Sequence, residues 1–260
     1  MAQPWITTVE EAGVKREAVK IGDVISANDG DVSISMVTYE LLSKNMDIPV
    51  CVDIGVDKGW WSQFCIAVHP GAIVHAYEPN PISYRALATK FAQEPNITLY
   101  NRAVSDSSGS MPLHLDEGQS HSRDLSGGVL VEKVTLDNLF EKVERVFLMK
   151  IDTEGHEPQV FRGLDQYFDR IDNIIFEFTT HWYGNTKTAM KINSGKLLTN
   201  ISESYPYLYI LSRRGPVKAF GPIEKGTIYD HVIFLNEIHL QVDILASRRP
   251  LETLELERIY

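Results

Sequence analysis

Acidic side chains gather directly after one apolar run of the chain. The run 146–151 contains Lys150, and Asp152, Glu154 and His156 follow it. Carboxylates this close repel one another, so they must be paired with cations, be protonated or bind a metal ion. Side chains alternate along a strand, so Lys150 shares a face with Asp152. The pattern favours acid–base chemistry or a divalent-cation site, and an ion pair between Lys150 and Asp152 is the structural alternative.

A second group of reactive side chains ends the next apolar run. Glu177 lies inside the run 173–178, where a carboxylate needs a partner or a chemical role. His181, Trp182 and Tyr183 follow within a few residues. The imidazole is a candidate base near neutral pH, and the aromatic rings are candidates for the wall of an acceptor site. A core aromatic cluster with a surface histidine is the alternative interpretation.

A turn with two glycines follows an earlier run, 50–54. Asp53 and Gly55 open it, and Asp57 and Gly59 continue it. A dinucleotide fingerprint would need two further glycines, at positions 57 and 60. A carboxylate at position 57 would instead face the pyrophosphate. The observed spacing suits a cofactor with a cationic sulfonium and an amino-acid group, such as S-adenosylmethionine, because Asp tolerates the left-handed geometry of the turn.

Glu78 ends the run that follows this turn. A carboxylate at the end of the second strand of such a fold can accept hydrogen bonds from two ribose hydroxyls. Together with the glycine turn, Glu78 therefore favours an adenosyl cofactor.

The elements that must position these residues alternate between two kinds of segment. Short apolar runs are typical of strands buried on both faces of a parallel sheet, and they lie at 50–54, 73–77, 97–100, 146–151, 174–178, 207–211 and 231–235. Stretches with helical character lie at 60–68, 82–91, 136–140 and 157–168. This alternation predicts an α/β fold with a doubly wound sheet. The Gly/Pro-rich link before 231–235 predicts an antiparallel C-terminal hairpin.

Six stretches, taken in order, resemble the FkbM family of S-adenosylmethionine-dependent methyltransferases. They are Val52–Gly59, Tyr77–Pro81, Asn101–Ser105, Val134–Asp137, Lys150–Glu157 and Ile175–Glu177. The resemblance spans roughly residues 50–180, and Lys-Ile-Asp-x-Glu-Gly-His-Glu is its most specific part. Asp57 departs from the family, which more often has Asn there. The resemblance implies a Rossmann-like class I methyltransferase fold and an enzyme that methylates hydroxyls of sugars or natural products.

The resemblance also assigns roles to individual residues. The cofactor-binding set it implies is Asp53, Gly55, Asp57, Gly59, Glu78, Pro79, Asn80, Asn101, Ala103 and Asp152. The candidate catalytic residues are Asp152, Glu177, His181, His156 and Lys150. Candidate substrate contacts are Glu154, Trp182 and Tyr183, and candidate ligands of a divalent cation (Mg²⁺ or Mn²⁺) are Asp152, Glu154 and Glu177. Asn101 is equally compatible with a turn cap, and Glu157 with a structural acid in the first turn of a helix.

Two other functional classes share parts of this pattern. A nicotinamide-dependent sugar oxidoreductase or epimerase would have the same fold and the same ribose acid, although Asp57 argues against it. A non-catalytic module that binds the cofactor and docks to a partner is the second alternative. The leading hypothesis is an O-methyltransferase (class EC 2.1.1) acting on a small-molecule or glycan acceptor.

Length and composition fit one catalytic domain with extensions. The 260 residues divide into an N-terminal extension (1–48), with a short strand within 18–25 and a helix within 34–44, a methyltransferase domain (49–240) and a C-terminal tail (241–260). A polar loop at 116–128 could act as a lid. The net charge of −10 disfavours nucleic acid as a partner. Two cysteines in apolar runs indicate reduced core residues, and together with the absence of a long apolar segment they predict a cytoplasmic protein without a membrane span. Nothing in the sequence indicates the oligomeric state.

Overall fold

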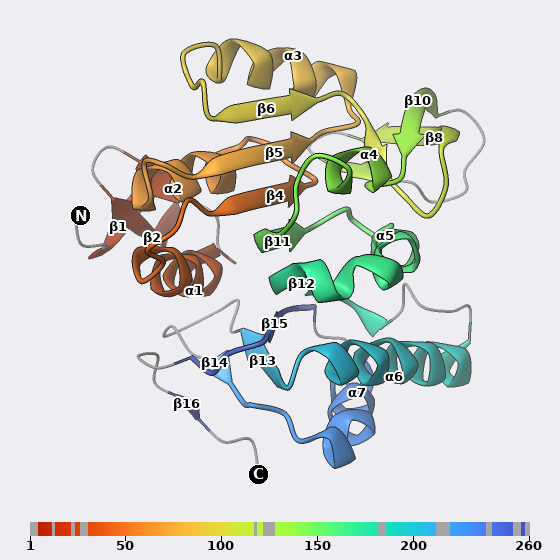
Figure 1. Cartoon of the computed structure of the whole chain (residues 1–260). Helices are drawn as coiled ribbons and strands as arrows, with labels where there is room; N and C mark the ends of the chain where they lie inside the picture. The colour runs from red at the N-terminus through yellow and green to blue at the C-terminus, as the bar shows by residue number, and fades with distance from the viewer. Residues whose placement is uncertain are drawn as a thin grey trace.

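The computed structural model describes residues 5–11, 14–21, 24–26, 31–116, 119–121, 128–180, 186–211, 219–237, 241–251 and 256–257. Within them a nine-stranded sheet forms the centre of the protein, in the order β16-β14-β13-β15-β12-β11-β4-β5-β6 (Figure 1). Its strands are β4 (Val50–Ile54), β5 (Ile73–Tyr77), β6 (Ile97–Tyr100), β11 (Val146–Ile151), β12 (Ile171–Phe178), β13 (Tyr207–Leu211), β14 (Ala219–Phe220), β15 (Val242–Ser247) and β16 (Leu256–Glu257).

Five neighbouring strands of this sheet run in one direction. β12, β11, β4, β5 and β6 pair in parallel, so their carboxyl ends lie together, at the arrowheads of Figure 1. β15 pairs antiparallel with both β12 and β13. These pairings confirm the predicted fold class, a Rossmann-like class I methyltransferase fold with a mostly parallel sheet and an antiparallel C-terminal pair.

The antiparallel partner of β13 differs from the predicted one. Residues 231–235 were expected to form a strand, but they belong to the helix α7 (Ile228–Glu237), and β15 pairs with β13 instead. The buried residues Ile228, Val232 and Leu235 recur at helical spacing, which explains why this apolar segment is a helix. Because β15 lies inside 241–260, that segment contains a buried central strand and is not simply a tail.

Helices cover both faces of the sheet. The helices α1 (Asp31–Ser43), α2 (Trp60–Val68) and α3 (Pro81–Lys90) lie on one face, and the opposite face holds α4 (Asp137–Phe140), α5 (Glu157–Leu164), the 3-10 helix η1 (Asp165–Arg170), α6 (Lys187–Ser204) and α7. Strand side chains alternate between two apolar cores: Cys51 faces α2, whereas Val52 faces α5. Cys51 and Cys65 are free thiols in the first core, as predicted.

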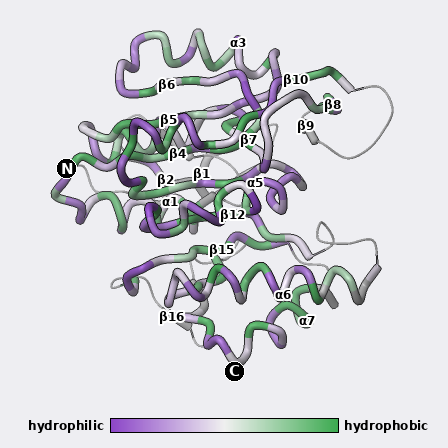
Figure 2. Tube along the Cα trace, turned by 45° about the vertical axis from the view of Figure 1, so that its right-hand side comes forward, coloured by the Kyte–Doolittle hydropathy of each residue, from purple (hydrophilic) through white to green (hydrophobic). Residues whose placement is uncertain are grey.

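The helix α6 was not predicted because its sequence is largely polar. Figure 2 shows hydrophilic and hydrophobic residues alternating along it. Its buried residues Ser194, Leu198 and Ile201 form one face, and Gly195 allows close approach of α7, since a Cβ there would lie 2.3 Å from the ring of Tyr229. None of the described helices is both long and apolar enough to cross a bilayer.

Two smaller sheets flank the central one. The N-terminal sheet contains β1 (Trp5–Glu11), β2 (Val14–Ile21) and β3 (Val24–Ser26), with β2 and β3 beside α1 and α2. The other contains β7 (Ala103–Val104), β8 (Gly109–Asp116), β9 (Gln119–His121) and β10 (Val129–Val134). The sequence predicted one strand and α1 in the first region. In the predicted loop 116–128, residues 117–118 and 122–127 lie outside the described residues, so its role as a lid stays a prediction.

Arg248, which directly follows β15, contacts three other segments: η1, the start of β12 and the end of α6. Its guanidinium donates hydrogen bonds to the backbone oxygens of Ile171 (3.0 Å), Ser204 (3.0 Å) and Phe168 (2.8 Å), and it lies 5.0 Å from the centroid of the Tyr205 ring.

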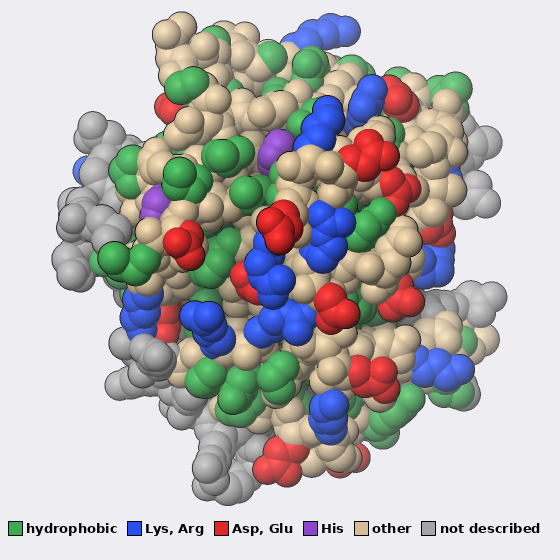
Figure 3. Space-filling view, viewed as in Figure 1, with side chains coloured by type: hydrophobic (Ala, Val, Ile, Leu, Met, Phe, Trp, Pro, Cys, Tyr) green, Lys and Arg blue, Asp and Glu red, His purple; other side chains and the backbone are tan. Residues whose placement is uncertain are grey.

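Figure 3 shows Arg and Lys side chains beside Asp and Glu across the middle of one face of the molecule.

We expect the substitution Arg248→Ala to lower the free energy of unfolding by about 2–4 kcal/mol. Three backbone carbonyls lose a charged donor, of which those of Ile171 and Phe168 keep the Tyr205 hydroxyl, and the Tyr205 ring loses its contact. Urea denaturation measures the change. Arg249→Ala is the matched control: Arg249 is exposed, so its removal should change stability by less than about 0.5 kcal/mol. Equal effects of the two substitutions would contradict the structural role of Arg248.

Candidate active site

The predicted site residues meet where the parallel strands end. Lys150 on β11 lies beside Asp53 on the neighbouring strand β4. Glu177, near the end of β12, lies opposite Asp243 on β15. Side-chain alternation places all four on the face that carries α1 and α2. Ligands of open α/β sheets bind at this end of the strands.

The turn after β4 contacts the end of β11 without space for a side chain. Gly55 has a φ of +86°, and a Cβ at this position would lie 1.7 Å from the backbone oxygen of Asp152. Asp152 in turn donates its N–H to the oxygen of Ile54 (2.9 Å). Glycine is required at position 55 because the backbone is left-handed there and because the Asp152 oxygen leaves no room for a Cβ. The cofactor turn and the acidic loop predicted from the sequence are therefore brought together.

Asp53 is held inside this turn with one oxygen available. Its Oδ2 accepts a hydrogen bond from Ser62 Oγ at 2.6 Å, while its buried Oδ1 has no hydrogen-bond partner among the described residues. Burial raises the pKa of Asp53 to about 6, although the neighbouring Lys150 ammonium acts in the opposite direction. A buried acceptor atom of this kind is suited to a charged donor such as an ammonium group.

Glu78 lies under the same turn. Its two carboxylate oxygens accept the backbone N–H groups of Asp57 (3.0 Å) and Asn80 (2.8 Å). Burial raises the pKa of Glu78 to about 7. Asn101 donates to the backbone oxygens of Glu78 (2.9 Å) and Pro79 (3.1 Å), which is the turn-capping role that the sequence left open.

Other predicted cofactor residues also have structural roles. Asn80 caps α3 by accepting the N–H of Ile82 at 2.9 Å. Gly59 has a φ of +76°, and a Cβ there would lie 2.4 Å from the ring of Phe91, so α3 packs directly on it. Ala103 is buried in β7. These contacts hold the turn, and the assignment of these residues to the cofactor stays a prediction.

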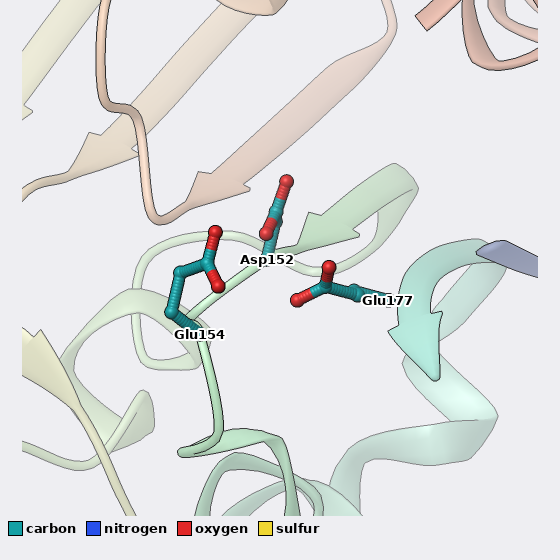
Figure 4. Close-up of side chains that lie close together, drawn as sticks. All are labelled: Asp152, Glu154 and Glu177. Atoms are coloured by element: carbon teal, nitrogen blue, oxygen red, sulfur yellow. The ribbon is translucent and has the colours of Figure 1, made fainter. Parts of the chain in front are cut away.

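Three carboxylates converge beyond the end of β11. Ligand oxygens of Asp152, Glu154 and Glu177 all lie within 4.8 Å of one another, and Figure 4 shows the three side chains pointing toward a common space. Lys150, whose side chain is 5% exposed, forms an ion pair with Asp152 at 2.9 Å. We call Asp152, Glu154 and Glu177 the carboxylate triad. Like charges at this distance favour a cation or a shared proton.

His156, one of the two histidines predicted as candidate bases, contacts Ser105 rather than the triad. His156 Nε2 lies 3.0 Å from Ser105 Oγ, and burial lowers the pKa of this imidazole to about 4. It is therefore neutral near pH 7 and bonded to the segment after β7. His181, Trp182 and Tyr183 lie outside the described residues, so their roles stay predictions.

Asp243 is a residue of this end of the sheet that the sequence analysis missed. It is 2% exposed, and it lies directly opposite Glu177, at a separation that brings side chains into contact in antiparallel strands. The signal was present, because Asp243 interrupts the apolar run 242–246 in the same way that Glu177 interrupts its own. Because the last strand was predicted at 231–235, residues 242–246 were not considered as a strand and Asp243 was not proposed as a site residue.

Comparison with known proteins identifies relatives of this chain. A family model described as the methyltransferase FkbM domain matches residues 53–208. Hexuronic acid methyltransferase AglP of Haloferax volcanii is 27% identical over 170 residues, which cover 63% of this chain and 69% of that protein. Methyltransferase sdnD of Sordaria araneosa is 23% identical over 170 residues, covering 50% of this chain and 66% of that protein. This chain thus spans about two thirds of the length of each relative.

Among solved structures, a precorrin-6y C5,15-methyltransferase of Geobacter metallireducens is similar at a TM-score of 0.43 and 12% identity, over 82% of this chain and 88% of that chain.

The raised pKa of Glu78 has a consequence for stability. Its folded pKa is about 7 and its ordinary value is 4.5. The folded state binds this proton more tightly, so the stabilisation is fully present below pH 4.5 and is lost as pH rises from there to about 7. We expect the melting temperature of the ligand-free protein to fall less between pH ~4.5 and ~7.5 in Glu78→Gln than in the wild type.

Differential scanning calorimetry at several pH values measures this slope. Glu144→Gln, at an exposed position, should keep the wild-type slope. Identical slopes in the wild type and in Glu78→Gln would show that Glu78 does not titrate in this range.

Proposed function

Because the chain belongs to the FkbM methyltransferase family, we propose that it transfers the methyl group of S-adenosylmethionine to a hydroxyl of a sugar or glycan-type acceptor. The observation that carries this proposal is the carboxylate triad, which faces the same end of the sheet as the Gly55 turn. A donor bound at the turn and an acceptor bound at the triad would be neighbours.

The residues of the turn suit the proposed donor. S-adenosylmethionine carries a sulfonium and an ammonium group, and the buried Oδ1 of Asp53 is an acceptor for such a charged donor. Glu78 already accepts two backbone N–H groups, and its remaining lone pairs can accept the ribose hydroxyls. A nicotinamide dinucleotide fits less well, because Asp57 is the middle residue of the turn, where a carboxylate would face the pyrophosphate.

The triad suits an alcohol acceptor. Methyl transfer is an in-line displacement: the acceptor oxygen forms a bond to the methyl carbon, the sulfur–carbon bond breaks, and S-adenosylhomocysteine leaves. The hydroxyl proton must pass to a base, and in this proposal a carboxylate of the triad accepts it. The protein otherwise has to align the two reactants and exclude water. Similarity to a hexuronic acid methyltransferase supports a sugar as the acceptor.

The function is tested by incubating the protein with S-adenosylmethionine and a panel of neutral and uronic-acid glycans. We expect a mass gain of one methyl group on at least one glycan, and loss of that gain in Glu177→Gln with S-adenosylhomocysteine binding retained. Tight binding of S-adenosylhomocysteine without any mass gain would instead favour a non-catalytic module.

Calorimetry tests the donor site separately. Glu78→Ala should weaken S-adenosylhomocysteine binding by roughly tenfold or more, since charge-assisted hydrogen bonds are lost. Glu144→Ala, at an exposed position, should leave the affinity unchanged. If the wild type does not bind S-adenosylhomocysteine, the proposal is wrong.

The sequence also predicts Mg²⁺ or Mn²⁺ at Asp152, Glu154 and Glu177, and three carboxylates within 4.8 Å form a donor set that suits such ions. A divalent cation would lower the pKa of a bound hydroxyl. We expect methyl transfer to fall after dialysis against EDTA and to return with either ion, and isothermal titration to show Mn²⁺ binding that Glu177→Ala abolishes. An unchanged rate after EDTA would leave proton transfer to the carboxylates alone.

A cytoplasmic location and the absence of a nucleic-acid partner stay predictions.

A further inference from the structure

A buried carboxylate beside the triad is directed at the loop rather than at the common space of the triad. Glu157, the first residue of α5, is fully buried. One of its oxygens, Oε1, accepts both the N–H and the hydroxyl of Thr153, each at 2.6 Å. The other, Oε2, accepts the N–H of Gly155 at 3.0 Å. Both oxygens of Glu157 therefore hold the loop 153–155.

This loop has a backbone that needs such support. Glu154 has a φ of +52° and Gly155 a φ of +108°. The left-handed region is unfavourable for a side chain such as that of Glu154, and residues stay there only when their surroundings determine the conformation. The two residues that donate hydrogen bonds to Glu157, Thr153 and Gly155, lie directly before and after Glu154 in the chain. Their positions set the direction of the Glu154 side chain, which points toward Asp152 and Glu177 (Figure 4).

We propose that Glu157 is a positioning residue that holds the carboxylate of Glu154 in the triad, an inference that rests on the proposed function of that triad in methyl transfer. Glutamate is specifically suited to this role because both of its oxygens accept hydrogen bonds. A glutamine would present an NH₂ group to one of these donors, and two donors repel each other.

The donor site does not depend on Glu157 for its geometry. Asp152 is fixed by its own N–H to Ile54 (2.9 Å) and by Lys150 (2.9 Å). The contact between Gly55 and the Asp152 oxygen is part of the same arrangement. Loss of Glu157 should therefore affect the acceptor side of the reaction and leave cofactor binding in place.

The test compares Glu157→Gln with the wild type, using a glycan that gains a methyl group. We expect kcat to fall about tenfold or more, while KM for S-adenosylmethionine and the affinity for S-adenosylhomocysteine change by less than about twofold. A double-mutant cycle with Glu154→Gln gives the mechanism. If Glu157 acts through Glu154, the double variant is no slower than Glu154→Gln alone, whereas general damage to the fold would add to it.

Two further comparisons keep the test interpretable. If Glu157→Gln does not fold, Thr153→Val removes only the hydroxyl donor to Glu157, and kcat should fall about threefold, with Thr153→Ser restoring it. Asp172→Asn is the control for a lost structural carboxylate. It breaks an ion pair with Arg145 (2.8 Å) at the start of β12, far along the strand from the triad, and kcat should not change.

A crystal structure of Glu157→Gln tests the proposal without any acceptor. We expect the Glu154 carboxylate to leave the triad. The proposal is overturned if that carboxylate remains within 4.8 Å of Asp152 and Glu177, or if kcat is unchanged in a wild type that transfers methyl groups. A wild type that methylates no glycan would contradict the proposed function, while the crystal structure would still decide the role of Glu157.

Discussion

The absence of a side chain at Gly55 is the constraint on which the site depends. The backbone oxygen of Asp152 lies where a Cβ would be, 1.7 Å from the ideal position of that atom. Parallel pairing of β4 and β11 brings the two chain segments to the same end of the sheet, but pairing alone does not bring the turn and the loop into contact. Glycine does so, and the glycine turn thereby adjoins the acidic loop.

Charge is the second property that organises this end of the sheet. Asp53, Glu177 and Asp243 are each almost completely buried, and the nearby Lys150 is directed at Asp152. Burying carboxylates is unfavourable unless cations or donors compensate them. The sulfonium of the proposed cofactor would add positive charge where these acids are concentrated. The acidity of the whole chain therefore has a local use, beyond any effect on solubility.

Much of this arrangement could be predicted from the sequence because local signals were strong. The apolar runs at β4, β5, β6, β11 and β13 have the predicted bounds, and Asp152, Glu154 and Glu177 converge as their positions after neighbouring strands implied. The failures have physical reasons. The apolar segment of α7 can form either a strand or a helix, and its packing against α6 decides the outcome. The role of Glu157 depends on the left-handed backbone of the loop, for which the sequence offers only Gly155 as a sign.

The position of β15 also bears on how the chain folds as it is synthesised. β12 and β13 do not pair with each other, because each pairs with β15. When the ribosome has produced the chain only as far as β13, one edge of β12 still has unpaired N–H and C=O groups, and Glu177 has no opposite residue. Exposed strand edges of this kind promote association with other chains. Completion of the acidic end of the sheet, and protection of the buried strand β12 from aggregation, therefore wait until residues 242–247 emerge.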